Sequence, residues 1–342
     1  MGVPLADVLA NNTSLGAANP SGPIAVFVGA TAGIGLGALQ ALTKYTNAST
    51  IYIVGRSPLK LEALIGDLKQ LNAKATFIPI HASDLTKIHD AQSAAREIAE
   101  KVGAGQVDLL VMSPGYITFK GREEHPEEGV DKCTAVRHYS RMAFVLGLKD
   151  ALQRAPGPRI VSVLAGGKEG ALWKEDMLLR EKGRYGVSVA GGAAASMHSL
   201  FFEEVAKRPG WEKAVFIHNF PGAVSTGLEV SGLGMIGDFL LNWLARPIIY
   251  WVGYTQEEAG ERVLFAATSG RFRRVEGVIG EGSLIMKGSD GVVGSGVYIV
   301  QADTMAVQPT KEMVKLRGEG MGEVVYQHTV KVLQKIEKGE RA

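Results

Sequence analysis

One tyrosine in this chain is placed to exchange a proton, but the cation that usually assists such a tyrosine is missing. The stretch Tyr185-Gly-Val-Ser-Val189 leads into a predicted helix and has Val189 where a Tyr-x-x-x-Lys pair has its lysine. A phenol ordinarily has a pKa near ~10, and a neighbouring cation usually supplies the roughly 4 kcal/mol that brings it to neutrality. Tyr185 is therefore predicted to be a catalytic acid or base without its usual cation. The alternative is a packed core tyrosine.

A glycine-rich turn provides the clearest binding motif. The run Val26-Phe-Val-Gly29-Ala-Thr31-Ala-Gly33-Ile34-Gly35 leaves a predicted strand at 24–28 and opens a predicted helix at 36–46. In such a turn Gly29 permits the tight bend, Gly33 lets the backbone approach a pyrophosphate, and Gly35 allows close helix packing. The helix N-terminus adds amide donors and the positive end of its dipole. The motif predicts a dinucleotide site.

The residue at the end of the next predicted strand, 50–54, indicates which dinucleotide binds. Arg56 stands 21 residues after Gly35. An acidic residue at this point would bind the 2′-hydroxyl of NAD, whereas an arginine can pair with the 2′-phosphate of NADP. We therefore expect NADP as the cofactor, the alternative being that Arg56 is a solvated loop cation.

The elements that must position these residues alternate regularly along the chain. Short apolar segments are typical of strands buried on both faces of a sheet, and segments 61–71 and 88–102 have the apolar spacing of helices. This alternation predicts an α/β fold, a Rossmann-type doubly wound parallel sheet flanked by helices. Further predicted strands lie at 75–80, 107–112, 159–164, 214–218 and 296–300.

Several turns follow these strands at the sheet edge where ligands of such folds bind. Asp84-Leu85 follows the third strand, and Ser113-Pro-Gly115 follows the fourth. Pro221-Gly222 follows the sixth, with the hydroxyl of Thr226 four residues further on. We expect these turns to complete the dinucleotide site.

Together these motifs resemble the short-chain dehydrogenase/reductase family over roughly residues 22–303, most closely its fungal secondary-metabolism reductases around 138–142 and 161–167. The resemblance implies an NADP-dependent oxidoreductase that acts on a carbonyl/alcohol of a hydrophobic small molecule, and a homo-oligomer. Its implied dinucleotide contacts are Gly29, Thr31, Ile34 and Gly35, then Asp84 and Leu85 at the adenine, Gly115 at the ribose, and Pro221, Gly222 and Thr226 at the nicotinamide.

The other catalytic positions of that family depart from its pattern. Its serine position falls on Ala165, and its asparagine position falls near Arg137, with His138 or Tyr139 as the neighbouring choices. Two further functions therefore stay open: a non-redox isomerase, cyclase or dehydratase, and a catalytically inactive NADP-binding protein. The cations that could replace the missing lysine are Lys168, Lys174 and Arg184, together with Arg137 and Arg141 if these face the cleft rather than solvent.

Composition narrows the range of partners. The 342 residues carry 37 basic and 35 acidic side chains, with no long basic run, so a nucleic-acid surface is not expected. The histidines lack metal-ligand spacing, and the acidic run Glu123–Glu128 is interpreted as a solvated loop. The single cysteine, Cys133, and the lack of a secretory pattern indicate the cytoplasm.

The chain is expected to form one main domain with appendages. Residues 1–21 are predicted to be a flexible lead-in, 22–303 the Rossmann-type domain, and 304–342 a helical extension with an amphipathic face through Val324, His328, Val332 and Ile336. An apolar segment at about 230–253 is predicted to be a lid over an apolar pocket. Contact with a membrane surface is the less favoured alternative.

Overall fold

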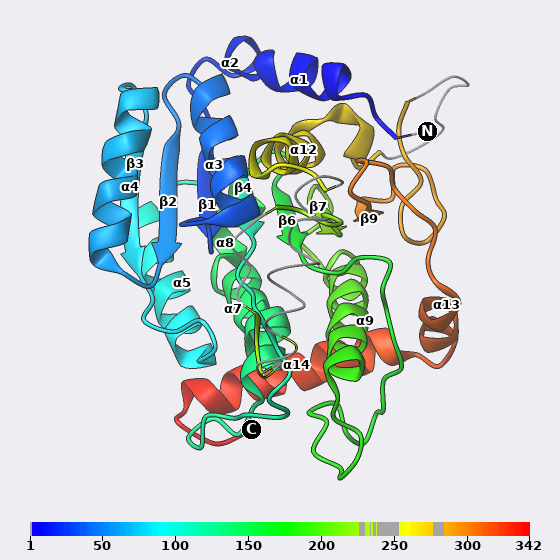
Figure 1. The fold of residues 1–342 in the computed structure, drawn as a ribbon. Coiled ribbons are helices and arrows are strands. Elements are labelled where there is room, and N and C mark those ends of the chain that lie inside the picture. Colours follow the sequence, from blue (N-terminus) through cyan, green and yellow to red (C-terminus); the bar gives the residue numbers. More distant parts are fainter. Residues whose placement is uncertain (1, 226–229, 233, 235–236, 238–252, 276–283) are drawn as a thin grey trace.

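A seven-stranded parallel sheet forms the centre of the protein, with strand order β3-β2-β1-β4-β6-β7-β9. The computed structural model describes residues 2–225, 230–232, 234, 237, 253–275 and 284–342 (Figure 1). The order reverses between β1 and β4, so the predicted Rossmann-type doubly wound fold is confirmed. The strands are β1 Ile24–Val28, β2 Thr50–Gly55, β3 Thr76–His81, β4 Leu109–Met112, β6 Arg159–Val163, β7 Val215–Asn219 and β9 Val297–Val300.

The sequence placed these strands to within two residues at either end because each is a short apolar run. All five residues of β7 and all four of β4 are buried, as expected for strands covered by helices on both faces. The parallel register carries the carboxyl ends of β1, β2 and β4 to one edge, with Val28 opposite both Val54 and Met112. The turns after these strands therefore meet.

Helices cover the sheet on both faces (Figure 1). One face packs against α1 (Leu5–Thr13), α3 (Gly33–Tyr45), α4 (Pro58–Leu71) and α12 (Gln256–Thr268). The other packs against α5 (Ile88–Val102), α7 (Ser140–Gly147), α9 (Val187–Val205) and α14 (Met321–Glu337). The shorter elements are α2 Leu15–Ala18, β5 Ile117–Thr118, α6 Lys132–Thr134, the π-helical turn η1 Ala135–Tyr139, α8 Lys149–Arg154, β8 Val230–Ser231, η3 Gly270–Phe272 and α13 Lys311–Gly318.

The lead-in at 1–21 is helical, which differs from the flexible segment that the sequence predicts. Helix α1 buries Val8 and Asn12 completely. The Asn12 amide Nδ2 donates to the main-chain oxygen of Glu261 at 2.9 Å and to its carboxylate at 2.7 Å. These partners lie in α12, some 249 positions away, so the local composition of the lead-in gave no sign of them.

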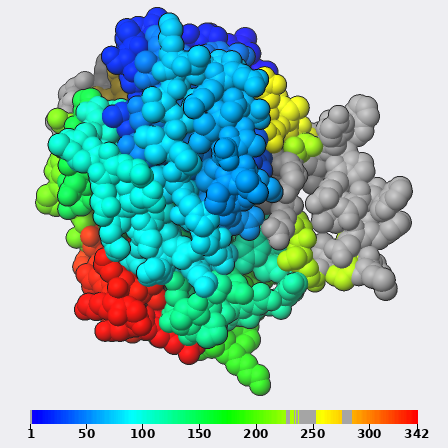
Figure 2. All heavy atoms as spheres, turned by 90° about the vertical axis from the view of Figure 1, so that its left-hand side faces the viewer, coloured from blue at the N-terminus to red at the C-terminus, as the bar shows by residue number. Residues whose placement is uncertain are grey.

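The C-terminal extension consists of two helices rather than one. Gly320, with φ of +69°, separates α13 from α14 in a left-handed conformation that glycine adopts readily. Helix α14 lies across α9 and also contacts α5 (Figure 1), and Figure 2 shows its red surface beside the cyan one. Val332 and Ile336 are buried as predicted, but Val325 and Thr329 are buried in place of Val324 and His328, so the face is rotated by one position in its first half.

The acidic run before α6 was wrongly interpreted as solvated, because one of its carboxylates is buried. Glu128 is only 4% exposed and accepts hydrogen bonds from the amides of Ile88 and His89, both at 2.9 Å. These amides open α5, whose own cap residue, Lys87, provides no side-chain acceptor. The carboxylate therefore provides acceptors for the unpaired amides at the start of a helix that lies 40 residues earlier in the chain.

The predicted lid falls mostly outside the described residues. Of it, β8 (Val230–Ser231) is described and pairs in parallel with β5 (Ile117–Thr118). No helix in the described parts of the chain is long and apolar enough to cross a membrane.

Candidate active site

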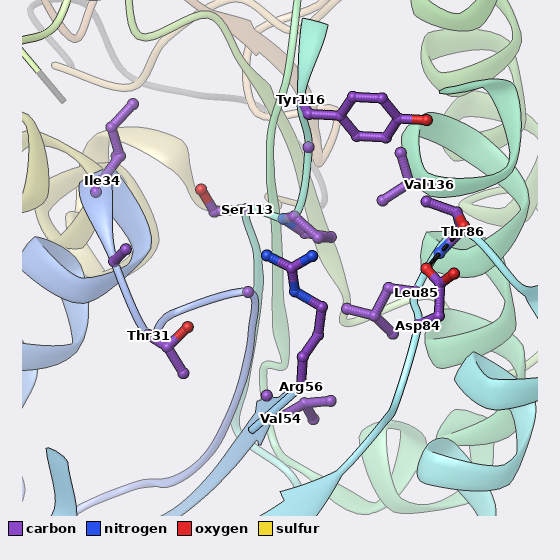
Figure 3. A pocket seen from close by; sticks show the side chains of 16 residues that line it. Thr31, Ile34, Val54, Arg56, Asp84, Leu85, Thr86, Ser113, Tyr116 and Val136 are labelled. Carbon is purple, nitrogen blue, oxygen red and sulfur yellow. Dashed lines mark hydrogen bonds between the residues drawn. The ribbon is translucent and has the colours of Figure 1, made fainter. Parts of the chain in front are cut away.

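A cavity of about 250 Å³ opens where the carboxyl ends of β1, β2 and β4 meet. In Figure 3, Thr31 and Ile34 lie on one side of Arg56, and Asp84 and Leu85 lie on the other. The location is the switch point of the sheet, where ligands of doubly wound folds bind. Its lining comprises Gly29, Thr31, Ala32, Gly33, Ile34, Val54, Gly55, Arg56, Asp84, Leu85, Thr86, Ser113, Pro114, Gly115, Tyr116 and Val136.

At the glycine turn, one wall of the cavity is formed by main-chain atoms, because the glycines have no side chains. Gly29 has φ of +76°, and a Cβ atom added to it would lie 2.6 Å from the Pro114 nitrogen. Gly33 has φ of +59° and lines the cavity directly. Gly35 is not part of the lining; a Cβ there would lie 2.8 Å from the Gly29 oxygen. Gly35 thus allows α3 to pack closely against the turn.

The start of α3 offers unsatisfied donors to this cavity. Its cap residue, Ala32, provides no side-chain hydrogen bond. The first amides of a helix then need another acceptor, and the positive end of the helix dipole favours an anion. A diphosphate fits the combination of a side-chain-free cradle and uncapped amides.

Arg56 leaves the end of β2 and reaches across the cavity toward Ser113 (Figure 3). The residue is exposed, and it forms no ion pair with any carboxylate in the described part of the chain. Only its carbonyl oxygen is engaged, 3.1 Å from His81 Nε2. The guanidinium is therefore available to an anionic ligand.

On the opposite wall, the Asp84 carboxylate forms hydrogen bonds within the turn to which it belongs. Its Oδ1 atom accepts from the Thr86 amide at 2.8 Å and from the Thr86 hydroxyl at 2.7 Å. Its Oδ2 atom lies 3.6 Å from His125 Nε2. Leu85 is buried beside it and contributes an apolar surface to the cavity.

Beyond Ser113 and Gly115 the cavity ends at Tyr116 and Val136, which sequence reasoning did not select (Figure 3). Tyr116 directly follows the Ser113-Pro-Gly115 turn and could have been found from that position. Val136 belongs to η1 and gave no signal, because it resembles any core valine.

Two of the predicted nicotinamide-side residues do not line this cavity. Pro221 and Gly222 follow β7 and are not part of the cavity lining, while Thr226 lies outside the described residues. Gly222 has φ of +72°, and a Cβ there would approach Ala302 to 2.9 Å. The structure therefore gathers the predicted residues that follow β1, β2, β3 and β4 around one cavity, apart from Gly35, whereas Pro221 and Gly222 are not part of its lining.

Tyr185 is half-buried just before α9 and packs against a small apolar cluster of Leu179, Ala190 and Ala193. Burial raises the pKa of its phenol, and the Asp131 carboxylate raises it further. The Arg137 guanidinium acts in the opposite direction and lowers this pKa. The carboxylate and the guanidinium thus act on the pKa of the phenol in opposite directions.

The π-helical turn η1 decides which of three consecutive side chains faces the site. The Arg137 Nη2 atom donates to the Tyr116 carbonyl at 3.2 Å. His138 and Tyr139 instead point to α14, where His138 Nε2 lies 2.9 Å from the Thr329 hydroxyl and the Tyr139 hydroxyl lies 2.7 Å from a ring nitrogen of His328. Arg137 is thus the residue directed toward the cavity rim. π-turns inside helices are frequent at functional sites.

Arg141 lies fully buried beneath the cavity, although the sequence left open whether it faces the cleft or solvent. Its Nη1 atom donates to the Ser162 hydroxyl at 2.5 Å and to the Val163 carbonyl at 2.9 Å, and its Nη2 atom donates to the Pro114 carbonyl. Burial lowers the pKa of this guanidinium to about 9. Arg141 therefore ties together the chain segments that leave β4 and β6.

The comparisons with known proteins agree with this architecture. A family model described as short chain dehydrogenase matches residues 23–173. The chain is 30% identical to oxidoreductase AN1596 of Emericella nidulans, over 89% of this chain and 91% of that protein. It is 31% identical to oxidoreductase andH of Emericella variicolor, over 92% of each. The chain belongs to the short-chain dehydrogenase/reductase family.

A solved structure shares the fold of this short-chain dehydrogenase/reductase at low sequence identity. L-sorbose reductase from Gluconobacter frateurii, complexed with NADPH and L-sorbose, superimposes with a TM-score of 0.51. The two chains are 18% identical, and the match covers 73% of this chain and 90% of that one. In this chain two helices, α13 and α14, follow β9, the last strand among the described residues.

Besides Arg137 near the asparagine position, this short-chain dehydrogenase/reductase departs from the catalytic pattern that the family resemblance implies at Val189 and at Ala165. Val189 lies on the exposed side of α9, 38% exposed, and carries no charge. Ala165 has no hydroxyl, and its amide donates to His218 Nε2 at 3.3 Å.

The cations predicted between β6 and Tyr185 are directed elsewhere. Arg184 pairs with Glu175, Asp176 and Glu181, the shortest contact being 2.8 Å to Glu181. The Lys168 Nζ atom lies 5.0 Å from the centre of the Phe220 ring, and Lys174 is exposed. None of the three is among the charged groups that act on the Tyr185 phenol.

Proposed function

We propose that this short-chain dehydrogenase/reductase uses NADP and transfers hydride to or from a carbonyl/alcohol pair of a hydrophobic small molecule. The observation that carries the proposal is the single cavity shared by the glycine turn, the uncapped start of α3 and the Arg56 side chain. The first two suit a diphosphate, and the guanidinium suits a 2′-phosphate. The NADPH of the similarly folded L-sorbose reductase supports this choice.

The proposal assigns each wall of the cavity a part of the dinucleotide. Bound NADP would supply or accept the hydride at its nicotinamide. The diphosphate would lie on the glycine turn, and the 2′-phosphate at Arg56. The adenine would lie against Asp84 and Leu85, and the adjoining ribose against Ser113 and Gly115. The loop from Pro221 to Thr226 is assigned the nicotinamide side by family resemblance.

Tyr185 is proposed to handle the proton that accompanies the hydride. In reduction, the carbonyl carbon gains the hydride, the oxygen takes the phenolic proton, and the phenolate then regains a proton from solvent. Oxidation of the alcohol runs these transfers in reverse. The apolar cluster against which Tyr185 packs, namely Leu179, Ala190 and Ala193, supports a hydrophobic substrate. A place in secondary metabolism is included in the proposal on the family resemblance alone, and the single buried thiol, Cys133, fits the cytoplasm.

The test measures reaction stoichiometry with a panel of aldehydes and apolar ketones. We expect one NADPH oxidised for each alcohol formed, and a loss of about 10² to 10⁴ in kcat for Tyr185→Phe. If no carbonyl supports turnover at saturating NADPH, and Tyr185→Phe leaves the natural product unchanged, the proposal is wrong.

A non-redox isomerase, cyclase or dehydratase is the second candidate. It is favoured by the absence of a lysine at Val189 and of a hydroxyl at Ala165, two groups that the usual hydride chemistry of the family employs. Such an enzyme would convert its substrate with no change in nicotinamide absorbance. Comparing product formation with absorbance in one reaction therefore separates the two candidates.

A further inference from the structure

The side chain of Arg137 links the end of the cavity to the helix that follows Tyr185. Its Nη2 atom donates to the carbonyl of Tyr116, a residue of the cavity lining, at 3.2 Å. Its Nη1 atom lies 3.8 Å from the point where a Cβ atom would stand on Gly191 of α9. This spacing is an ordinary van der Waals contact, so the Arg137 guanidinium lies directly beside α9.

Tyr185 packs against the same stretch of α9. Its ring contacts the small apolar cluster that includes Ala190 and Ala193. The segment 131–137, whose elements α6 and η1 contact α9, carries the groups that act on the pKa of the phenol, namely Asp131, Cys133 and Arg137. Arg137 is the one cation among these three groups.

The Asp131 carboxylate opposes formation of a phenolate at Tyr185. It is buried, with Oδ1 accepting from the Glu123 amide at 3.1 Å and Oδ2 accepting from the amide and hydroxyl of Thr134 at 2.9 and 3.0 Å. These hydrogen bonds stabilise the charged carboxylate. A phenolate formed next to it during catalysis therefore needs a compensating positive charge.

Arg137 carries a positive charge that could compensate the phenolate. It is half-buried and forms no ion pair with any carboxylate in the described ranges of the chain. Its hydrogen bond is to a neutral main-chain oxygen, which leaves the net charge uncompensated. An opposite charge within about 4–6 Å typically lowers a pKa by 1–3 units, and Arg137 acts on the Tyr185 phenol in that direction.

We propose that Arg137 is the positioning residue that stabilises the Tyr185 phenolate, in place of the lysine missing at Val189. The inference rests on the proposed function, in which Tyr185 gives its proton to the substrate oxygen while the carbonyl carbon receives hydride. The phenolate left behind faces Arg137 until solvent returns a proton. The cation thus comes from η1, which contacts α9, rather than from α9 itself.

The experiment titrates the phenol directly in the full-length protein. Near-ultraviolet absorbance of tyrosinate is followed against pH, and the curve of Tyr185→Phe is subtracted to isolate Tyr185. We expect Arg137→Gln and Arg137→Met to move this ionisation up by about one pH unit or more, whereas Arg137→Lys keeps it near its natural position. Two neutral variants are included so that a folding defect in one, checked by circular dichroism, leaves the other.

The pH profile of alcohol oxidation gives the functional readout. Because the base form of Tyr185 is needed, the rising limb of kcat/KM should shift upward with the phenol, lowering kcat/KM at neutral pH by about 10-fold or more in Arg137→Gln. Adding Val189→Lys to Arg137→Gln should restore both readouts, since position 189 is exposed enough for a lysine side chain to reach along α9.

The outcomes separate the two proposals. An unchanged Tyr185 titration in the neutral Arg137 variants overturns the role of Arg137, whatever the activity. A shifted titration in a protein that oxidises no alcohol and reduces no carbonyl keeps the electrostatic pairing and overturns the redox function instead.

Discussion

The Nδ1 atom of His218 lies 2.7 Å from the hydroxyl of Ser199, and this contact belongs to a buried chain whose direction is fixed. The Ala165 amide donates to the other ring nitrogen of His218, so that nitrogen carries no proton and Nδ1 must carry one. Ser199 therefore accepts from His218 and donates to the Glu169 carboxylate at 2.9 Å. This series of hydrogen bonds fixes the loop after β6, where the family has its serine. The His218 ring takes part in it as a neutral imidazole.

Removing the central hydroxyl of this chain should destabilise the fold. Ser199→Ala leaves the His218 N–H without its acceptor in a fully buried site and is expected to cost about 1–3 kcal/mol of unfolding free energy. Urea denaturation measures this loss. Ser188→Ala, at an exposed position on the same helix, is the matched control and should change stability by less than about 0.5 kcal/mol. If the two substitutions lowered the unfolding free energy equally, the hydrogen bonds from His218 through Ser199 to Glu169 would not have the stabilising role described above.

Three buried histidines should make the protein sensitive to acid. His138, His198 and His218 lie in contact, with ring centres 6.1 and 4.7 Å apart. Burial lowers the pKa of His138 and of His218 to about 3, and lowers that of His198 well below its ordinary value. An unfolded histidine titrates near ~6.5, so between these pH values the unfolded chain binds more protons and stability falls as pH falls.

The expected loss is about 1.4 kcal/mol at pH 5.5 for each of these histidines, relative to pH above 7. Unfolding free energies from urea titrations at several pH values provide the measurement. His198→Leu should reduce the slope of unfolding free energy against pH by the contribution of one proton. His89→Gln, at a side chain that is 65% exposed, should leave this slope unchanged. A stability that does not vary between pH 7.5 and about 5.5 would show that the cluster is already protonated or solvated.

The sequence predicted those parts of the fold and site that depend on short stretches of chain. Residues 24–35 form a strand, a turn and the start of a helix, and the residue types of this short stretch show which backbone conformations it needs. Arg56 follows from the same reasoning because it ends the next strand. These residues lie around one cavity, although cofactor binding itself stays a prediction.

The parts that the sequence did not predict depend on contacts between distant segments. Glu128 caps a helix 40 positions away, and Asn12 binds Glu261 across 249 positions. The choice of Arg137 over its neighbours depends on the π-turn and on Tyr116, 21 residues earlier. No periodicity or local composition encodes which element will lie beside such a side chain.

Loss of the Glu128 carboxylate should weaken the start of α5. Glu128→Ala removes the acceptor of two helix-opening amides and is expected to lower the unfolding free energy by about 1–2 kcal/mol, as measured by urea denaturation. The adjacent Glu127 is 56% exposed and pairs with Lys87, so Glu127→Ala serves as the control and should leave the urea midpoint unchanged. If both variants unfold at the natural urea midpoint, Glu128 does not act as the cap of α5.

Arg56 should decide between the two nicotinamide dinucleotides. Arg56→Ala removes the guanidinium that reaches into the cavity, and the loss of charge-assisted hydrogen bonds to a 2′-phosphate should weaken NADPH binding about 10- to 100-fold. NADH has no 2′-phosphate, so its affinity should change by less than about 3-fold. Isothermal titration calorimetry with each dinucleotide measures both values.

The control for this prediction is Lys60→Ala, which removes an exposed cation from the first turn of α4 that does not line the cavity. It should leave both affinities unchanged and so separates direct pairing from a general loss of positive charge. An Arg56→Ala variant that loses NADPH and NADH affinity equally would place Arg56 at a group common to both dinucleotides. A variant that still binds NADPH with its natural affinity would make Arg56 the solvated loop cation, and the preference for NADP would have to come from another residue.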